Sequence, residues 1–233
     1  MSYLTYDPAT SKYPIRGFSN PNSVVSPDNP DDPFIDDVFL YLKGDGENDS
    51  TLFTDYSISP KIVTPSGNTK ISTTQSKYGA SSIYFDGIDD YLAVTGLWTA
   101  NSTVTIESWL YPTATFTSGW FDCAPGVSGA FRHYNGEIHR ANSSGITVSL
   151  TTNQWSHLAT CINTTTGRLT AYLNGTLVND VAVSTTYSLS EFVIGSINKG
   201  FADYTGYMDS FRVTLADRYT SNFDPEADTY LAY

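Results

Sequence analysis

The sequence predicts an all-β protein, a two-sheet antiparallel sandwich preceded by an extended N-terminal arm. From residue 36 onward, short runs rich in Val, Ile, Tyr and Phe are bounded by Gly, Asp or Asn, which is typical of strands. No window of a dozen residues keeps a helical period beyond one turn near Leu215. Because about a dozen such runs follow one another without a strand-helix-strand rhythm, a parallel sheet is excluded and a sandwich is favoured.

The predicted strands are short and rich in β-branched and aromatic residues. They cover residues 38–42, 82–85, 91–94, 104–111, 155–162, 169–173, 192–194 and 207–213.

Two Asn-Gly pairs predict tight hairpins, because both central residues of a type I′ turn need positive φ. Asn174-Gly175 is expected to join residues 169–173 to residues 176–178. Asn135-Gly136 is expected to join residues 131–134 to residues 137–140.

The second hairpin also bears on metal binding. Its register places His133 opposite Ile138 and Arg132 opposite His139. The two histidines then point to opposite faces of the sheet, so they do not share one zinc ion.

Residues 1–35 differ from the rest of the chain. They hold six of the eleven prolines, and their few apolar residues follow no period. Proline fixes φ and removes a backbone donor, so we expect an extended arm here. The chain is therefore divided into an arm, residues 1–35, and a β domain, residues 36–233.

Charge and cysteine content narrow the possible partners and compartments. Twelve Lys plus Arg against twenty-four Asp plus Glu give a net charge of −12, which disfavours nucleic acid and anionic membranes. Cys123 and Cys161 form no disulfide framework. The N-terminus has no signal-peptide pattern, and no apolar run is long enough to span a membrane, so we expect synthesis in a cytoplasm without Sec export.

Four ordered stretches resemble the laminin G-like jelly roll of the concanavalin A-like lectin/glucanase superfamily, over about residues 36–224. They are residues 78–92 with Phe85-Asp86-Gly87, residues 104–111, residues 155–175, and residues 194–213. The resemblance is strongest to the modules of bacteriophage virion proteins, which often begin with a strand such as residues 38–42 and Gly44-Asp45-Gly46. They often close with a segment such as residues 218–223.

The resemblance implies a non-enzymatic phage virion surface protein. On this hypothesis it is a capsid decoration or cement protein, whose arm lies along other virion proteins and whose domain faces outward, with homo-oligomers allowed. The alternative hypothesis is a tail-fibre or adhesin lectin that binds host glycans. A polysaccharide hydrolase is the third and least favoured hypothesis.

The disfavour of hydrolysis has a chemical reason. Glycosidases of the superfamily carry a Glu-x-Asp-x-Glu strand, which places two carboxylates on one sheet face. Glu107 stands in such a strand, but neither residue 105 nor residue 109 is acidic. The strand therefore offers no second carboxylate about 5 Å away for a retaining mechanism.

Calcium is the metal that suits the acidic loops. Asp86, Asp89 and Asp90 lie on a Gly-containing turn, and oxygen ligands on a flexible loop fit this ion. In related jelly rolls a structural calcium often bridges such a turn and an Asp like Asp209, with further help here from Asp45 or Asp55. The other interpretation is that Asp and Gly simply make good turns.

Sugar binding by such folds uses exposed aromatic rings. Trp98, Trp120, Tyr134 and Phe201 stand beside Gly or in predicted loops, so they are the candidate platforms for a glycan or a neighbouring protein. Trp109 and Trp155 fall within predicted strands, so both are expected in the core.

Overall fold

The computed structural model describes residues 32–95, 103–115, 118–123, 125, 131–134, 136–140, 145–183 and 191–226. Within them the single helical element is a short 3-10 turn, η1 (Ile35–Asp37). No helix of the described residues has the length and apolar character to cross a membrane. The strands are β1 (Val38–Leu42), β2 (Val63–Ser66), β3 (Lys70–Ser72), β4 (Ser82–Asp86), β5 (Tyr91–Val94), β6 (Val104–Pro112), β7 (Phe121–Asp122), β8 (Phe131–Tyr134), β9 (Glu137–Arg140), β10 (Ile146–Thr147), β11 (Ser156–Asn163), β12 (Arg168–Leu173), β13 (Thr176–Ala182), β14 (Phe192–Ile194) and β15 (Thr205–Thr214).

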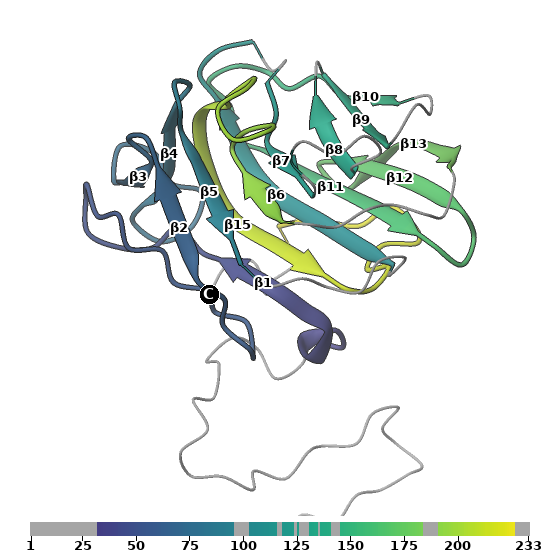
Figure 1. Ribbon diagram of the computed structural model, residues 1–233. Helices are drawn as coiled ribbons and strands as arrows, with labels where there is room; N and C mark the ends of the chain where they lie inside the picture. The colour runs from purple at the N-terminus through teal and green to yellow at the C-terminus, as the bar shows by residue number, and fades with distance from the viewer. Residues whose placement is uncertain are drawn as a thin grey trace, which may run out of the picture.

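The strands form two antiparallel sheets, as predicted (Figure 1). Sheet A has the order β13-β12-β11-β6-β15-β4-β3, and β1 also pairs with β15. Sheet B has the order β10-β9-β8-β7-β14-β5-β2. The predicted all-β sandwich is thereby confirmed.

Strand β15 organises sheet A. It pairs with β6 on one side; on its other side the first half pairs with β4 and the second half with β1. Its register against β6 shifts between Asp209 and Arg212, and Ser210 there has φ of 52°. Such a bulge adds one residue and reverses the facing of those that follow. Arg212 therefore faces the same side as Asp209.

The core lies between the two sheets. Alternate residues of β6, Val104 and Ile106, point into it, and sheet B contributes a cluster of aromatic rings. The ring centroid of Phe121 lies 5.0 Å from that of Phe131 and 6.5 Å from that of Phe192. Burial of each large apolar side chain contributes roughly 1.5–3 kcal/mol, so this cluster is a main source of stability.

Both predicted hairpins are confirmed. Leu173 pairs with Thr176 across Asn174-Gly175, whose φ values are 48° and 73°. In the other hairpin, His133 pairs with Ile138 and Arg132 with His139, which is the predicted register. Strands β2, β3, β7 and β10 were not predicted; β7 and β10 are only two residues long, and β2 contains Pro65.

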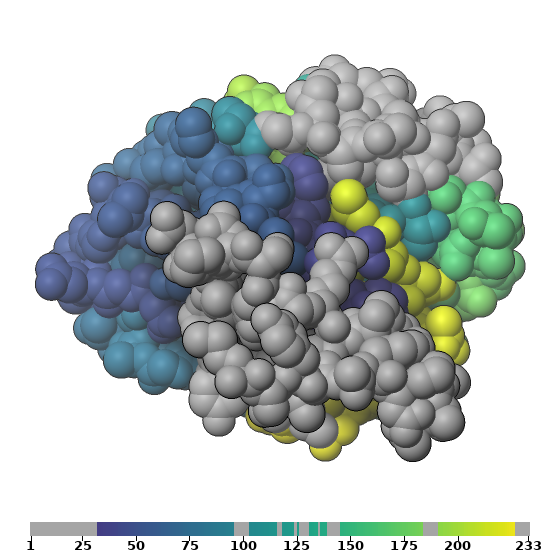
Figure 2. Space-filling model, turned by 90° about the horizontal axis from the view of Figure 1, so that it is seen from below, coloured from purple at the N-terminus to yellow at the C-terminus, as the bar shows by residue number. Residues whose placement is uncertain are grey.

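The two ends of the described chain meet on the surface of sheet A. Figure 2 shows N-terminal atoms in purple beside C-terminal atoms in yellow, in agreement with the pairing of β1 and β15. Asp32, only 4% exposed, accepts hydrogen bonds from Arg218 Nη2 at 3.1 and 3.0 Å. Residues 32–35 of the predicted arm thus contact the β domain, whereas residues 1–31 lie outside the described part.

Candidate functional site

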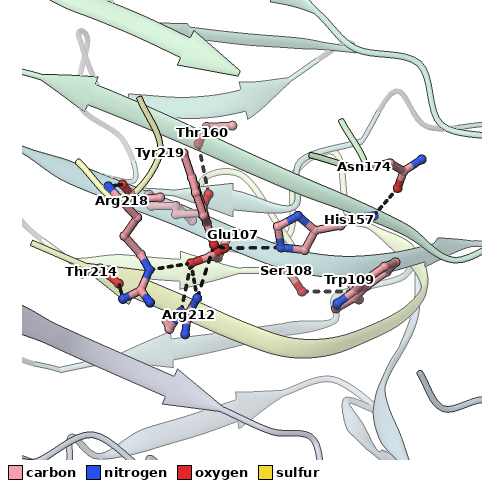
Figure 3. A network of polar contacts seen from close by, with 12 residues as sticks. Glu107, Ser108, Trp109, His157, Thr160, Asn174, Arg212, Thr214, Arg218 and Tyr219 are labelled. Carbon is pink, nitrogen blue, oxygen red and sulfur yellow. Dashed lines mark hydrogen bonds and ion pairs between the residues drawn. The ribbon is translucent and has the colours of Figure 1, made fainter. Parts of the chain in front are cut away.

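Glu107 lies in the middle of β6, on the face of sheet A turned away from the core, and it is completely buried (Figure 3). Arg212 stands opposite it on β15, with Nη2 2.8 Å and Nε 2.9 Å from Oε1 of Glu107. Tyr219 donates its hydroxyl to Oε2 at 2.7 Å. His157 Nε2 lies 3.3 Å from the same oxygen.

A second acid and a second base complete this buried network. Arg218 Nε lies 3.6 Å from Glu107 Oε1, while its Nη2 holds Asp32. Arg212 Nη1 lies 3.9 Å from Asp32 Oδ2. Two carboxylates therefore face two guanidinium groups, and their charges balance.

This arrangement keeps Glu107 ionised. Burial alone would raise the pKa of its carboxyl, but Arg212, His157 and Arg218 together hold that pKa well below its usual range. A general acid for glycoside cleavage needs the opposite shift and access to the sugar. Buried and ionised in this way, Glu107 is unsuited to act as a general acid.

The segment of residues 219–223 covers sheet A around Glu107. The rings of Tyr219 and Phe223 stack with centroids 3.6 Å apart, and Phe223 also meets His157 and Tyr172 edge-on. Phe223 donates its N–H to the carbonyl of Gly175 at 2.9 Å, and a Cβ on Gly175 would lie 1.9 Å from Phe223 O. The hairpin glycine therefore also allows this segment to dock.

Two of the predicted platform residues come together at one end of the strands of sheet B. Tyr134, at the end of β8, and Phe201, in the loop after β14, have ring centroids 5.8 Å apart at 41°. Their exposed fractions are 36% and 55%. Together with Asp89 and Asp203, described below, they form what we call the rim site.

The loop that carries Phe201 is held by its own backbone. Ile197 and Phe201 exchange two N–H···O bonds of 2.9 Å, and Gly200 donates its N–H to Ser196 Oγ at 2.8 Å. Asn198 and Lys199, between them, have φ of 52° and 61°. Such bonding fixes the exposed ring in place before any ligand arrives, which lowers the entropic cost of binding.

The acidic turn after β4 adjoins this loop. Asp89 donates its N–H to Asp203 Oδ2 at 3.0 Å, and Asp203 is a rim residue that sequence reasoning missed. Asp90, fully buried, accepts N–H bonds from Asn68 at 2.5 Å and from Asp86 at 2.6 Å. Burial raises the pKa of Asp90, although these two bonds oppose the shift. Asp86 and Asp90 thus serve mainly to build the turn.

Asp209 lies elsewhere, so the four predicted calcium ligands form no single cluster. Thr205 pairs with Asp86, and Asp209 follows four residues later on β15, about 13 Å further at the rise of a strand. Asp209 instead accepts N–H bonds from Lys77 at 2.8 Å and from Tyr78 at 3.1 Å. One ion therefore cannot contact both the turn and Asp209, and that part of the prediction is wrong.

Calcium itself stays a prediction. Among the described residues, no group of three or more His, Cys, Asp or Glu side chains is placed to hold a metal ion. Asp55 is occupied in its own turn, where its carboxylate accepts N–H bonds from Tyr41, Ser57 and Lys61. Asp45 is close enough to Asp209 to raise its pKa, so these two carboxylates remain the pair that a cation would suit best.

The tryptophans depart from expectation in two cases. Trp120 is fully buried and packs edge-on against Phe121 and Phe211, so its ring offers no platform to a ligand. Trp155 is partly exposed instead of lying in the core, because it precedes β11. Trp109 is 3% exposed, as expected for a buried ring. Trp98 lies outside the described residues.

Comparison with solved structures identifies the same fold in domains of other proteins. Domain 4 of AbnA, an extracellular arabinanase from Geobacillus stearothermophilus solved with arabinotriose, matches with a TM-score of 0.58 at 18% identity, over 84% of this chain and 98% of that one. The binding domain of Paraclostridial Mosquitocidal Protein 1 matches with 0.58 at 14%, over 84% and 52%. The ligand-binding domain of botulinum neurotoxin serotype D, solved with N-acetylneuraminic acid, matches with 0.58 at 12%, over 83% and 50%.

Comparison of the sequence with family models identifies the family of the chain. No curated protein matches the sequence significantly. The sequence model described as the concanavalin A-like lectin/glucanases superfamily matches residues 85–215, which is more than half of the chain and includes β6, β11, β12 and β15. The chain therefore belongs to the concanavalin A-like lectin/glucanase superfamily.

Proposed function

We propose that this chain is a lectin-like domain that binds glycans through the rim site and does not cleave them. The observation that carries the proposal is the exposed pair formed by Tyr134, at the end of β8, and Phe201, on a hydrogen-bonded loop, whose ring centroids lie 5.8 Å apart. Aromatic rings of this kind stack on the apolar face of a sugar, while carboxylates such as Asp89 and Asp203 accept hydrogen bonds from its hydroxyl groups. The arabinanase domain with arabinotriose and the neurotoxin domain with N-acetylneuraminic acid support a binding role.

Charge favours neutral sugars over acidic ones at this site. The chain carries −12, and the rim itself presents Asp89 and Asp203. The nearby Lys199 is paired with Glu191 at 2.6 Å, so it adds little net attraction for an anion. We therefore expect arabinotriose-like neutral oligosaccharides to bind in preference to sialylated ones.

Loss of either rim ring should weaken this binding. We expect Tyr134→Ala and Phe201→Ala each to lower the affinity for the best neutral oligosaccharide about tenfold, which corresponds to about 1.4 kcal/mol of lost stacking. Binding would be screened on a glycan array that includes arabinotriose and N-acetylneuraminic acid, then measured by titration calorimetry. Tyr56→Ala is the matched control, since Tyr56 is partly exposed and its ring packs against Tyr41 of β1, away from the rim site.

The proposal fails under two results. The first is that the full chain binds no glycan on the array at millimolar concentration. The second is that both rim variants bind as tightly as the unmodified chain. Release of reducing ends from any bound polysaccharide would contradict the non-catalytic part of the proposal separately.

The virion setting stays a prediction. The resemblance to phage modules suggested a capsid decoration protein, but none of the similar structures named above is a virion protein. The arm that would contact other virion proteins falls mostly in residues 1–31, outside the described part. Glycan binding is therefore the better supported of the two hypotheses.

A further inference from the structure

A row of four aromatic side chains crosses the outer face of sheet A. We call Tyr84, Tyr207, Tyr111 and Trp155 the aromatic row. Successive ring centroids lie 5.0, 5.9 and 5.4 Å apart in that order. All four side chains are partly exposed.

The row follows from the register of the sheet. Tyr207 of β15 stands opposite Tyr84 of β4 and opposite Tyr111 of β6, so the three side chains share one line across the strands. Trp155 continues the line immediately before β11. Three steps between neighbouring strands span about 14 Å, which is the length of several sugar units.

The outer face of sheet A is covered at one end and partly exposed at the other. Around Glu107 the C-terminal segment covers the sheet and leaves Trp109 only 3% exposed. The aromatic row lies beyond this cover, where its rings stay partly accessible. A contiguous row of partly exposed rings is an apolar surface patch. Such patches commonly mark interaction sites.

The surroundings of the row are suited to an uncharged ligand. Lys70, opposite Tyr84 at the sheet edge, is held by Asp49 at 2.6 Å. Beyond the row, Asp86 pairs in register with Thr205. The tyrosine hydroxyls of the row can donate hydrogen bonds to sugar hydroxyls or accept them, and the carboxylate of Asp86 can accept them. A polyanion would be repelled by a chain of −12.

We infer that the aromatic row binds an extended neutral polysaccharide, whose chain runs across the strands and whose sugar rings stack on the four side chains. This inference rests on the proposed glycan-binding function and deepens it by naming the ligand as a polymer. The rim site would take a short sugar, whereas the row gains contacts with each added unit. Affinity should therefore rise with chain length only where the row is intact.

Affinity gel electrophoresis of the full chain tests the inference. The gels would contain arabinan, xylan, glucomannan or laminarin as neutral probes and polygalacturonate as the acidic one. At least one neutral polymer should retard the protein, and polygalacturonate should not. Tyr207→Ala and Trp155→Ala should each weaken that retardation about tenfold. Tyr207→Phe, which keeps the ring, should change it less than threefold.

Controls separate this inference from fold stability and from the rim. Cross-strand aromatic pairs also stabilise sheets, so each variant is first shown by thermal melting to be folded at the assay temperature. Tyr56→Ala, at a partly exposed tyrosine outside both sites, should behave like the unmodified chain. Tyr134→Ala should lose short oligosaccharides but retain part of the polymer binding.

Each outcome bears on a different proposal. Retardation that survives in the Tyr207→Ala/Trp155→Ala double variant overturns the aromatic row, whatever the rim variants do. Absence of retardation by all four neutral polymers overturns it as well. If the row variants lose the polymer while the rim variants lose nothing, the row stands and the rim site is wrong.

Discussion

Replacing Arg212 by Met should lower the free energy of unfolding by about 3–5 kcal/mol at neutral pH, which is a large share of the stability of one domain. The guanidinium is 2% exposed and lies 2.8 Å from a carboxylate that is fully buried. Met fills much of the same volume, so the loss would come from charge and not from a cavity. Glu107 would be left as a buried anion whose remaining basic neighbours among the described residues are Arg218, 3.6 Å away, and His157, 3.3 Å away.

The pH dependence of this deficit identifies its cause. In the unmodified chain Glu107 is ionised in the folded state, because its cationic neighbours lower its pKa. Without Arg212 the carboxyl loses its strongest lowering partner, so the pKa of Glu107 in the folded variant is higher than in the unmodified chain. The two folded proteins then differ in proton binding only below the pKa of the variant. The deficit should therefore be largest at neutral pH and should shrink as the pH falls through the pKa of Glu107 in the variant.

A double-mutant cycle provides the control. Glu107→Gln/Arg212→Met restores charge balance, so it should recover much of the stability that Arg212→Met loses. Urea unfolding, at an unchanged denaturant dependence, would measure the single variants Glu107→Gln and Arg212→Met and the double variant. A loss below about 1 kcal/mol in Arg212→Met, or a double variant no better than the single one, would show that the network contributes little.

The fold could be predicted from the sequence because its signals are local. Runs of β-branched and aromatic residues located the long strands, and the Asn135-Gly136 pair predicted the register of the β8–β9 hairpin to the residue. Strands β7 and β10 were missed because two residues hold too little pattern, and β2 was missed because proline is rare inside strands. The resemblance of ordered motifs, confirmed over residues 85–215, supplied the topology that alternation alone does not contain.

The sites were harder to predict because they depend on contacts between distant segments. Simple alternation from Tyr207 would turn Arg212 toward the core, and only the bulge at Ser210 brings it to Glu107. The rim pair joins β8 to a loop 67 residues later in the chain (201 minus 134). Trp155 was expected in the core, but it lies immediately before β11 and is partly exposed.

A buried carboxyl at Asp209 should make the protein less stable as the pH rises through the mildly acidic range. The residue is 1% exposed. Burial, with repulsion from Asp45, raises its pKa from 3.8 to about 7, although N–H bonds from Tyr78 and Lys77 oppose the shift. Between these two pH values Asp209 keeps its proton in the folded state and loses it in the unfolded state. The stabilisation from protonated Asp209 is therefore fully present below about pH 4, and the free energy of unfolding falls by about 4 kcal/mol as the pH rises to 7.

Asp209→Asn removes this titration while its amide oxygen can still accept the N–H bonds of Lys77 and Tyr78. In EGTA, the unfolding free energy of the variant minus that of the unmodified chain should rise by about 4 kcal/mol from pH 4 to pH 8. If Asp209 and Asp45 hold calcium as proposed, added calcium chloride should raise the melting temperature of the unmodified chain only, because the ion favours the ionised carboxylate. Parallel pH profiles for the two proteins would show that Asp209 ionises normally. A calcium shift of equal size in both would place the ion elsewhere, and no shift in either would remove the calcium site.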